Sequence, residues 1–351
     1  MDPILLSLQL LLGALGVLGV AAAEPSELLA QAGRFVATLG LTVVVARVSP
    51  LRIVRAAPVA YVATMAMLVA VLFVGVSPTG SEANRWLAVS NSFTIQPSEL
   101  MKVVVIAYLA AFFHNHLGDW HIWRPMLVIG VAAGVIVMQP DISTALFLFA
   151  LAFAIMLAAG TSLGRLVSIS LSAAMVAVVI GGPYLAQYSY LSDRITGFAD
   201  LWGDQVDVQG TSYQASRARV ALSQAGIVGI GPGRPVRVPE ASTDMVAVAV
   251  GQSLGLVGMI TLVSCFVLLV ARGLRIAAAA RGPGALLAAG ACAYIGGQAA
   301  LNLLVAAGLL PVTGVPLPFV SYGFNSLVSV SIAMGFMHAA FREARSQGAP
   351  L

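Results

Sequence analysis

The amino-acid sequence predicts an all-α, polytopic integral membrane protein with about ten transmembrane helices. Of its 351 residues, 59% are hydrophobic and only 9% are charged, whereas soluble domains carry about 25% charged residues. The mean hydropathy is +0.95, so much of the surface must face lipid rather than water. We expect a single membrane domain over residues 1–351, containing one large extracytoplasmic loop at 183–242.

Apolar runs that approach the roughly 20 residues needed to cross a bilayer recur along the chain. They lie near 4–22, 29–46, 57–76, 98–113, 125–140, 142–159, 165–182, 243–270, 284–308 and 323–341. The first run ends in Ala21-Ala22-Ala23, which resembles a signal-peptidase site, but no basic residue precedes it, so we expect a retained helix. Cys265 and Cys292 fall inside apolar runs, which is typical of core residues rather than of a disulfide or a metal site.

The distribution of charge predicts the orientation. If the loops alternate from a cytoplasmic N-terminus, the cytoplasmic segments hold ten of the 18 basic residues and three of the 14 acidic ones. The ten are Arg47, Arg52, Arg55, Arg124, Arg165, Arg272, Arg275, Arg281, Arg342 and Arg345. This excess predicts a multi-pass protein of the cytoplasmic (inner) membrane with both termini in the cytoplasm. It also accounts for the net charge of +4 without a nucleic-acid partner.

A motif before the fourth run combines a helix start with charged residues. It consists of Arg85, Trp86, Gln96, Pro97, Ser98, Glu99 and Lys102, the only lysine in the chain. Ser98 is expected to cap the helix, and Glu99 and Lys102, three residues apart, share one helix face. A capped helix with an interfacial ion pair explains the motif by itself, although a charged pair at membrane depth is also a functional-site hypothesis.

Prolines interrupt the apolar pattern at two further places. Pro140 ends one run and Asp141 can cap the next, so a turn is the simpler interpretation of Gln139-Pro140-Asp141. The segment 310–319 contains three prolines and a glycine, which forbid a regular helix. Non-helical backbone at membrane depth must be buried in protein or line a cavity, which predicts a re-entrant segment, with an ordinary outer loop as the alternative.

The end of the predicted outer loop carries two acids that border an apolar run. Glu240 and Asp244 stand one turn apart if this stretch is helical, and a lone carboxylate at Asp244 is costly unless it is paired or hydrated. Four arginines precede them, namely Arg217, Arg219, Arg234 and Arg237. An N-capped helix is the structural alternative, but the combination favours a site for an anionic, oxygen-rich substrate.

In their order along the chain, these motifs resemble the SEDS family of bacterial polytopic membrane proteins, which contains RodA, FtsW and SpoVE. The matching pieces are Arg85-Trp86, Gln96 through Lys102, Gln139-Pro140-Asp141, Tyr213-Gln214, Pro239-Glu240, Thr243-Asp244, Asn302 and Pro311 through Gly323. The resemblance covers residues 84–340, and its motifs look more like RodA than FtsW.

The resemblance implies a peptidoglycan glycosyltransferase that polymerises lipid II at the outer face of the cytoplasmic membrane, for cell elongation and rod shape. It also implies partners: a class B penicillin-binding protein, which docks through its transmembrane helix, and other proteins of the elongation complex. Small residues suited to helix packing lie at Gly251, Gly255, Gly258, Gly290, Gly296 and Gly297.

The family's essential acid corresponds to Asp244, with Glu240 as the second catalytic candidate. The expected substrate-binding residues are Arg85, Gln96, Glu99, Lys102, Asp141, Arg217, Arg219, Thr243 and Ser321. An α-linked donor and a β-linked product require inversion, so Asp244 would deprotonate the acceptor hydroxyl while cations stabilise the departing diphosphate. A divalent cation, Mg²⁺ or Mn²⁺, held by Asp244 is a further possibility, although the sequence contains no dense ligand cluster.

Two alternatives from other classes stay open. A lipid II flippase would also use many helices and a charged outer vestibule, but it needs polar residues along a path to the cytoplasm, and the inner halves of the predicted helices are nearly free of ionisable residues. A non-catalytic activator of a penicillin-binding protein fits the sequence as well.

Overall fold

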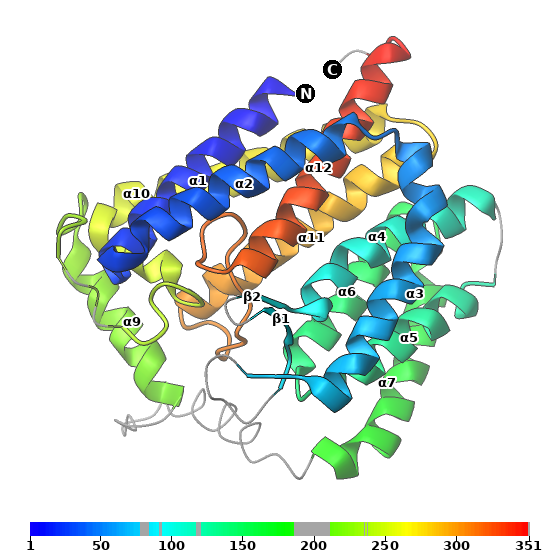
Figure 1. Cartoon of the computed structure of the whole chain (residues 1–351), viewed down its shortest axis with the longest axis horizontal. Helices are drawn as coiled ribbons and strands as arrows, with labels where there is room; N and C mark the ends of the chain where they lie inside the picture. The colour runs from blue at the N-terminus through cyan, green and yellow to red at the C-terminus, as the bar shows by residue number, and fades with distance from the viewer. Residues whose placement is uncertain are drawn as a thin grey trace.

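The computed structural model describes residues 1–77, 84–90, 93–116, 121–185, 211–234, 236 and 238–349. Figure 1 shows a bundle of long helices with a small two-stranded sheet at its side. The first part of the chain forms α1 (Pro3–Ala23), η1 (Pro25–Glu27), α2 (Leu28–Arg47), α3 (Pro50–Val74), β1 (Leu87–Ser90), β2 (Phe93–Ile95) and α4 (Pro97–Asn115). The remainder forms α5 (Trp123–Val137), α6 (Ile142–Ala158), α7 (Leu163–Leu185), α9 (Thr211–Ala225), α10 (Val246–Ala279), α11 (Pro283–Ala306) and α12 (Phe324–Ser346).

The prediction of an all-α polytopic membrane protein is confirmed. Within the described residues, seven helices are long and apolar enough to cross a membrane, namely α1, α2 with η1, α3, α4, α10, α11 and α12. Helices α5, α6 and the Leu163–Ser172 part of α7 are apolar but shorter. Each of the ten predicted apolar runs overlaps one of these helices.

Helix α11 lies at the centre of the bundle, where it packs against α4, α6, α10 and α12, while α1 lies along α10. The outer helices direct large apolar side chains away from the protein. Leu29 and Phe73 are each 82% exposed, and Val59 is 75% exposed. Such a surface is stable in hydrocarbon and not in water, so these faces are expected to contact lipid.

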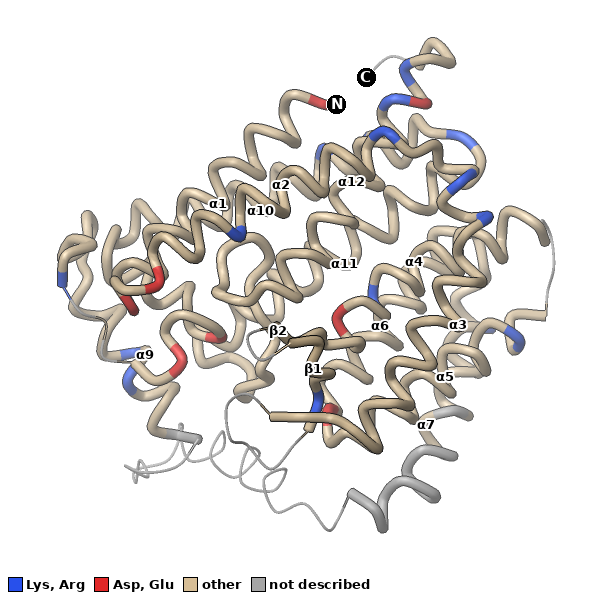
Figure 2. Tube along the Cα trace, in the orientation of Figure 1, with Lys and Arg blue, Asp and Glu red and all other residues tan. Residues whose placement is uncertain are grey.

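Both termini lie at the same end of the bundle (Figure 1). Asp2 caps α1 by accepting from the Leu5 amide at 2.9 Å, and it pairs with Arg272 of α10 at 2.6 Å. Burial opposes ionisation of Asp2, but the hydrogen bonds from Arg272 and Leu5 outweigh it and lower the pKa of this carboxyl. Many of the arginine positions lie toward this end (Figure 2), which the positive-inside rule predicts to be cytoplasmic.

Helix α10 is interrupted at Gly255, whose φ of 65° and ψ of −157° are not helical. The segment 226–231 fills this break with backbone hydrogen bonds, among them one from Gly231 N to Ser253 O at 3.1 Å. The two backbones approach so closely that a Cβ on Gly229 would lie 2.2 Å from the same oxygen. The close approach therefore requires glycine, and it fixes the short first part of α10 against the preceding loop.

Two elements were not expected from the sequence. Helix α9 lies inside the predicted 183–242 loop, and α7 ends at Leu185, just after the predicted start of that loop. Strands β1 and β2 form an antiparallel hairpin before α4, which Asn325 ties to α12 by donating to Thr94 O at 3.1 Å. Residues 186–210 and Arg237, to which the sequence assigns part of the outer charge, lie outside the described residues.

Candidate functional site

The carboxylate favoured by the sequence lies in a turn and not on a helix. Residues 239–245 form turns, and α10 begins at Val246 with Met245 at its N-cap. Within the turn, Met245 N donates to Glu240 O at 2.9 Å, and Thr243 Oγ1 donates to Glu240 Oε2 at 2.6 Å. Glu240 also has a φ of 54°, which few residues other than glycine adopt. Glu240 and Asp244 therefore do not lie on one helix face, because neither residue is helical. Glu240 accepts the hydrogen bonds within the turn, and the side chain of Asp244 is partly exposed.

Helix α11 and the predicted re-entrant segment that follows it (residues 307–323) hold this turn through the turn's backbone carbonyls. Buried Asn302 donates from Nδ2 to Asp244 O and to Val315 O, both at 2.8 Å. Ser321 donates from Oγ to Thr243 O at 2.7 Å. Since the carbonyls of Thr243 and Asp244 are held by donors from other parts of the chain, the backbone at Asp244 is fixed from outside its own helix.

The same segment approaches the Asp244 carboxylate directly. Gly314 has a φ of +71°, and a Cβ placed on it would lie 3.6 Å from Asp244 Oδ2. The prediction that residues 310–319 are non-helical is confirmed, because the segment has no regular secondary structure. That it lines a cavity stays a prediction. Ser321, a predicted substrate-binding residue, is 2% exposed and acts as a brace.

Helix α9 brings arginines to the same place. Gln214 of α9 donates from Nε2 to Pro239 O at 3.2 Å, directly before the turn. Arg219 lies against the start of the re-entrant segment, where a Cβ on Gly308 would be 3.3 Å from its Nε. The Arg217 guanidinium lies 5.9 Å from the centroid of the Tyr213 ring. Of these two arginines, Arg219 is thus the one that the structure places against the segment that also approaches Asp244.

A group of residues at the α1–α2 turn also contacts the site and was missed by sequence reasoning. Glu24 Oε1 accepts from Ser242 Oγ at 3.2 Å, and Glu27 Oε2 accepts from the Tyr322 hydroxyl at 2.6 Å. The Arg34 guanidinium lies 4.1 Å from the centroid of the Tyr322 ring. Burial raises the pKa of Tyr322, and the hydrogen bond to Glu27 raises it further, against an opposing effect of Arg34. The sequence signal for these contacts is the presence of two acids, Glu24 and Glu27, in the short turn between the first two apolar runs.

The predicted residues Arg85 and Asp141 form a second cluster at the α5–α6 turn. Arg85 donates to Gln139 O at 3.2 Å and to Pro140 O at 2.5 Å, and its guanidinium lies 4.0 Å from Asp141 Oδ1. Asp141 also caps α6 by accepting from the Thr144 amide at 3.2 Å. The structural interpretation of this motif as a capped turn is confirmed, and Arg85, with 25% of its side chain exposed, crosslinks it.

The predicted pair Glu99 and Lys102 is buried in the bundle. Lys102 Nζ lies 2.6 Å from Glu99 Oε1, and the two side chains are only 1% and 6% exposed. Lys102 also lies over the rings of Phe147 and Tyr294 at 5.6 and 5.7 Å. The two charges therefore contact each other inside the protein, so a direct contact with substrate requires a rearrangement of these helices.

The expected N-cap of α4 is wrong by two positions. The helix begins at Pro97, so Gln96 occupies the N-cap and makes no side-chain capping bond, while Ser98 is already helical and 1% exposed. Proline favours the first helical position because its missing N–H costs nothing there, which moved the start of the helix forward. Since Gln96 makes no side-chain capping bond, its predicted contact with substrate stays a prediction.

The described residues offer no group of three or more His, Cys, Asp and Glu side chains placed to hold a metal ion. Asp244 and Glu240 are the acids of the turn, and Glu240 is engaged by Thr243. This donor set does not form a metal centre by itself, so Mg²⁺ or Mn²⁺ at Asp244 stays a prediction, and no step below is assigned to a metal.

The fold and the site together define a polytopic membrane protein in which the segment between α11 and α12 approaches both an acid, Asp244, and an arginine of α9, Arg219. The family of cell cycle proteins FtsW, RodA and SpoVE matches residues 4–346, so the chain belongs to this family, also called SEDS. A probable peptidoglycan glycosyltransferase FtsW from Geobacter sp. (strain M18) is 33% identical over 79% of this chain and 76% of its own. A protein of the same description from Alkalilimnicola ehrlichii is 33% identical over 83% of this chain and 74% of its own.

Solved structures agree with this assignment. A chain from a peptidoglycan synthase complex, described as coordinating polymerization and crosslinking, has a TM-score of 0.80 at 26% identity and covers 98% of both chains. The rod shape determining protein RodA of Thermus thermophilus has a TM-score of 0.69 at 24% identity, over 97% of this chain and 96% of its own, which shows the fold alone. The family is confirmed, but the finer expectation of a RodA-like member is not, because these sequence relatives carry the name FtsW.

Proposed function

We propose that this protein is a peptidoglycan glycosyltransferase that polymerises lipid II at the outer face of the cytoplasmic membrane. The observation that supports this most is the convergence of Asp244 and α9 on one re-entrant segment. Asn302 and Ser321 brace the turn of Asp244, while Arg219 lies against the start of the same segment at Gly308. A base next to cations is what transfer from a diphosphate-linked sugar requires.

The proposed reaction is an inverting displacement. The 4-hydroxyl oxygen of the acceptor sugar bonds to the anomeric carbon of the donor, and Asp244 takes the hydroxyl proton. The bond between that carbon and the diphosphate oxygen breaks, and its electron pair leaves with the lipid diphosphate. Arg217 and Arg219 stabilise this charge, since guanidinium groups match phosphate oxygens in a fork geometry. Thr243 and Glu240 position the turn from within.

For the partner, we propose that the transmembrane helix of a class B penicillin-binding protein docks against α10 and α11. A groove of about 490 Å³ between α6, α10 and α11 is lined by small and apolar residues, including Gly296 and Gly297. Three of the other glycines expected at this interface are already covered by the protein itself. Gly251 and Gly290 pack against side chains of this chain, and Gly255 packs against the backbone of residues 226–231. Replacing Gly297 by leucine should therefore weaken co-purification more than replacing Gly258, which lies outside this groove.

The orientation is proposed from the arginine excess, and labelling of cysteines tests it. The native Cys265 and Cys292 are buried, so they give little background. A cysteine at exposed Ser223 on α9 should react with an impermeant maleimide added to intact spheroplasts, and one at exposed Arg281 should not. Labelling at 281 with protection at 223 would reverse the orientation.

The process served by the enzyme is a separate proposal. The motifs shared with RodA favour elongation and rod shape, and the FtsW name of the relatives favours division. Expression in cells depleted of their own RodA or FtsW separates the two: restored rod shape supports elongation, and restored septation supports division.

The direct test is polymerisation of labelled lipid II by the purified protein, with and without a class B penicillin-binding protein. Long glycan strands that depend on this chain are expected, with more product when the partner is present. Movement of lipid II across vesicle membranes without polymer would favour the flippase alternative and overturn the proposal. Polymer that appears only with the partner, and persists when Asp244 is changed to Asn, would make this chain an activator.

A further inference from the structure

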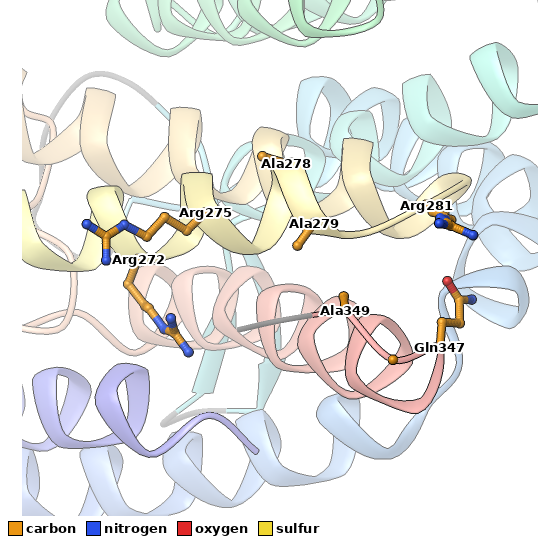
Figure 3. Close-up of a pocket in the computed structure, with 8 residues that line it drawn as sticks. Arg272, Arg275, Ala278, Ala279, Arg281, Gln347 and Ala349 are labelled. Atoms are coloured by element: carbon orange, nitrogen blue, oxygen red, sulfur yellow. The ribbon is translucent and has the colours of Figure 1, made fainter.

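A second charged site lies at the opposite end of the molecule from Asp244. The end of α10, the turn that follows it and the end of α12 enclose a cavity of about 620 Å³. Its walls are Arg272, Arg275, Ala278, Ala279, Arg281, Gln347, Gly348 and Ala349. Figure 3 shows Arg272 and Arg275 extending from α10 at one end of the cavity and Arg281 at its other end, with Gln347 and Ala349 on the facing segment. None of these residues belongs to the proposed active site.

The cavity carries positive charge that the described protein does not neutralise. Arg272 is paired with Asp2, whose side chain is fully buried, so this arginine fixes the helix end to the N-terminus. Arg275 and Arg281 are exposed, and neither has an ion-pair partner among the described residues. Both Arg275 and Arg281 line the cavity, so an anion bound in it would be attracted by their positive charge.

The remaining walls suit a phosphate group. Ala278, Ala279 and Gly348 carry little or no side chain, so the space between the arginines is not filled by the protein. Gln347 adds an amide that can donate a hydrogen bond, and each guanidinium can donate two parallel hydrogen bonds to phosphate oxygens. The chemistry of the cavity is therefore that of a phosphate monoanion or diester.

The surface beside the cavity is apolar and faces lipid. Leu268 lies one turn before Arg272 and two turns before Arg275, which places the three on one face of α10. Leu268 is 56% exposed, and its neighbours Val267 and Leu274 are 60% and 53% exposed. A cationic cavity at a helix end with an exposed apolar helix face next to it matches the two parts of a phospholipid.

We propose that this cavity binds the headgroup of an anionic phospholipid, whose acyl chains lie along the exposed face of α10. Basic pockets between transmembrane helices on the cytoplasmic side favour anionic lipids, because charge attraction and burial of the chains act together. The lipid joins the ends of α10 and α12 at a place where Arg275 and Arg281 have no ion-pair partner among the described residues.

Native mass spectrometry of the purified full chain tests this with dioleoyl phosphatidylglycerol as the probe and dioleoyl phosphatidylcholine as the zwitterionic comparison. The pocket variant is Arg275→Gln with Arg281→Gln. The matched control is Arg124→Gln with Arg165→Gln, which removes two exposed arginines from loops predicted on the same side. The pocket variant should bind phosphatidylglycerol roughly ten- to thirtyfold more weakly than the wild type, while the control and the phosphatidylcholine affinities change little.

Two results would overturn the proposal. One is a pocket variant that binds phosphatidylglycerol within twofold of the wild type, or a control that loses as much affinity. The other is a wild type in which inorganic phosphate raises the unfolding midpoint as much as phosphatidylglycerol does while no lipid stays bound, which would make the cavity an ion site. The unfolding midpoints of all variants without lipid must agree, so that lost binding is not lost folding.

Discussion

The turn of Asp244 and the helical pair Glu99–Lys102 are two ways of holding a carboxylate within a membrane protein. Asp244 is partly exposed, and its turn is fixed through backbone carbonyls by Asn302 and Ser321. Glu99 is 4% exposed and is held by its own helix neighbour at 2.6 Å. Asp244 therefore lies next to the segment between α11 and α12, whereas the charges of Glu99 and Lys102 contact each other.

The comparison separates a charge placed for chemistry from a charge placed for structure. A base must reach a substrate proton, so its side chain needs an approach from outside and a fixed backbone. A buried ion pair needs the reverse, since each charge is costly unless its partner stays in contact. We therefore assign the proposed chemistry to Asp244 and a stabilising role to Glu99 and Lys102.

The largest expected change in stability follows from breaking the buried pair. Lys102→Met leaves the Glu99 carboxylate without its cation, and Glu99 Oε2 has no hydrogen-bond partner to compensate. Removing one member of such a pair costs about 3–5 kcal/mol, so the unfolding midpoint in detergent should fall steeply. The double variant Glu99→Gln, Lys102→Met should recover much of the loss. A stable Lys102→Met protein that binds lipid II poorly would instead make the pair part of the substrate site.

A smaller loss of stability is expected when the side chain that braces the turn of Asp244 is removed. Asn302→Leu removes the donor shared by Asp244 O and Val315 O and should cost about 1–3 kcal/mol together with activity. Gln9→Leu is the control, because Gln9 is also buried and donates to Thr42 Oγ1 at 3.0 Å on other helices. Comparable stability loss with normal polymerisation is expected for the control. Equal polymerisation activity in the two variants would show that the hydrogen bonds from Asn302 are not needed for activity.

The smallest effect concerns the arginines of α9. Arg217→Gln and Arg219→Gln should each raise the KM for lipid II about tenfold, because each removes a charge-assisted hydrogen bond to the diphosphate. Arg234→Gln removes an exposed arginine of the same outer region and serves as the control. If all three variants change KM alike, the effect is a general attraction of the anionic lipid and not a specific contact.

The helices of this fold could be predicted from the sequence because spanning segments are long and uniformly apolar. Each of the ten predicted runs overlaps a helix. The predicted start of α4 differs because Ser98 is a good capping residue, whereas the helix begins at Pro97, in the first helical position that proline favours. Helix α9 and the hairpin at 87–95 escaped prediction because both are short and only partly apolar, so no bilayer-length signal marks them.

The site could be predicted only in part. Asp244 stood out because a lone acid beside an apolar run is costly, and that signal is local. The braces could not be predicted from local pattern, because Asn302 lies 58 residues from Asp244 and Ser321 lies 78 residues from Thr243. The contact of Glu27 with Tyr322 spans 295 residues and likewise depends on the packing of distant helices. Which polar residues meet is decided by tertiary structure.

The measurement that tests the account most directly is the rate of lipid II polymerisation by Asp244→Asn at saturating substrate, with the penicillin-binding partner present. Asparagine keeps the size and the backbone contacts of Asp244 but cannot accept the proton, so a folded variant should be slower by roughly 10²–10⁴. Glu240→Gln, in the same turn, should lower stability more than it lowers the rate. A variant Asp244→Asn with a normal unfolding midpoint that still builds long glycan strands at a near-normal rate would contradict the account.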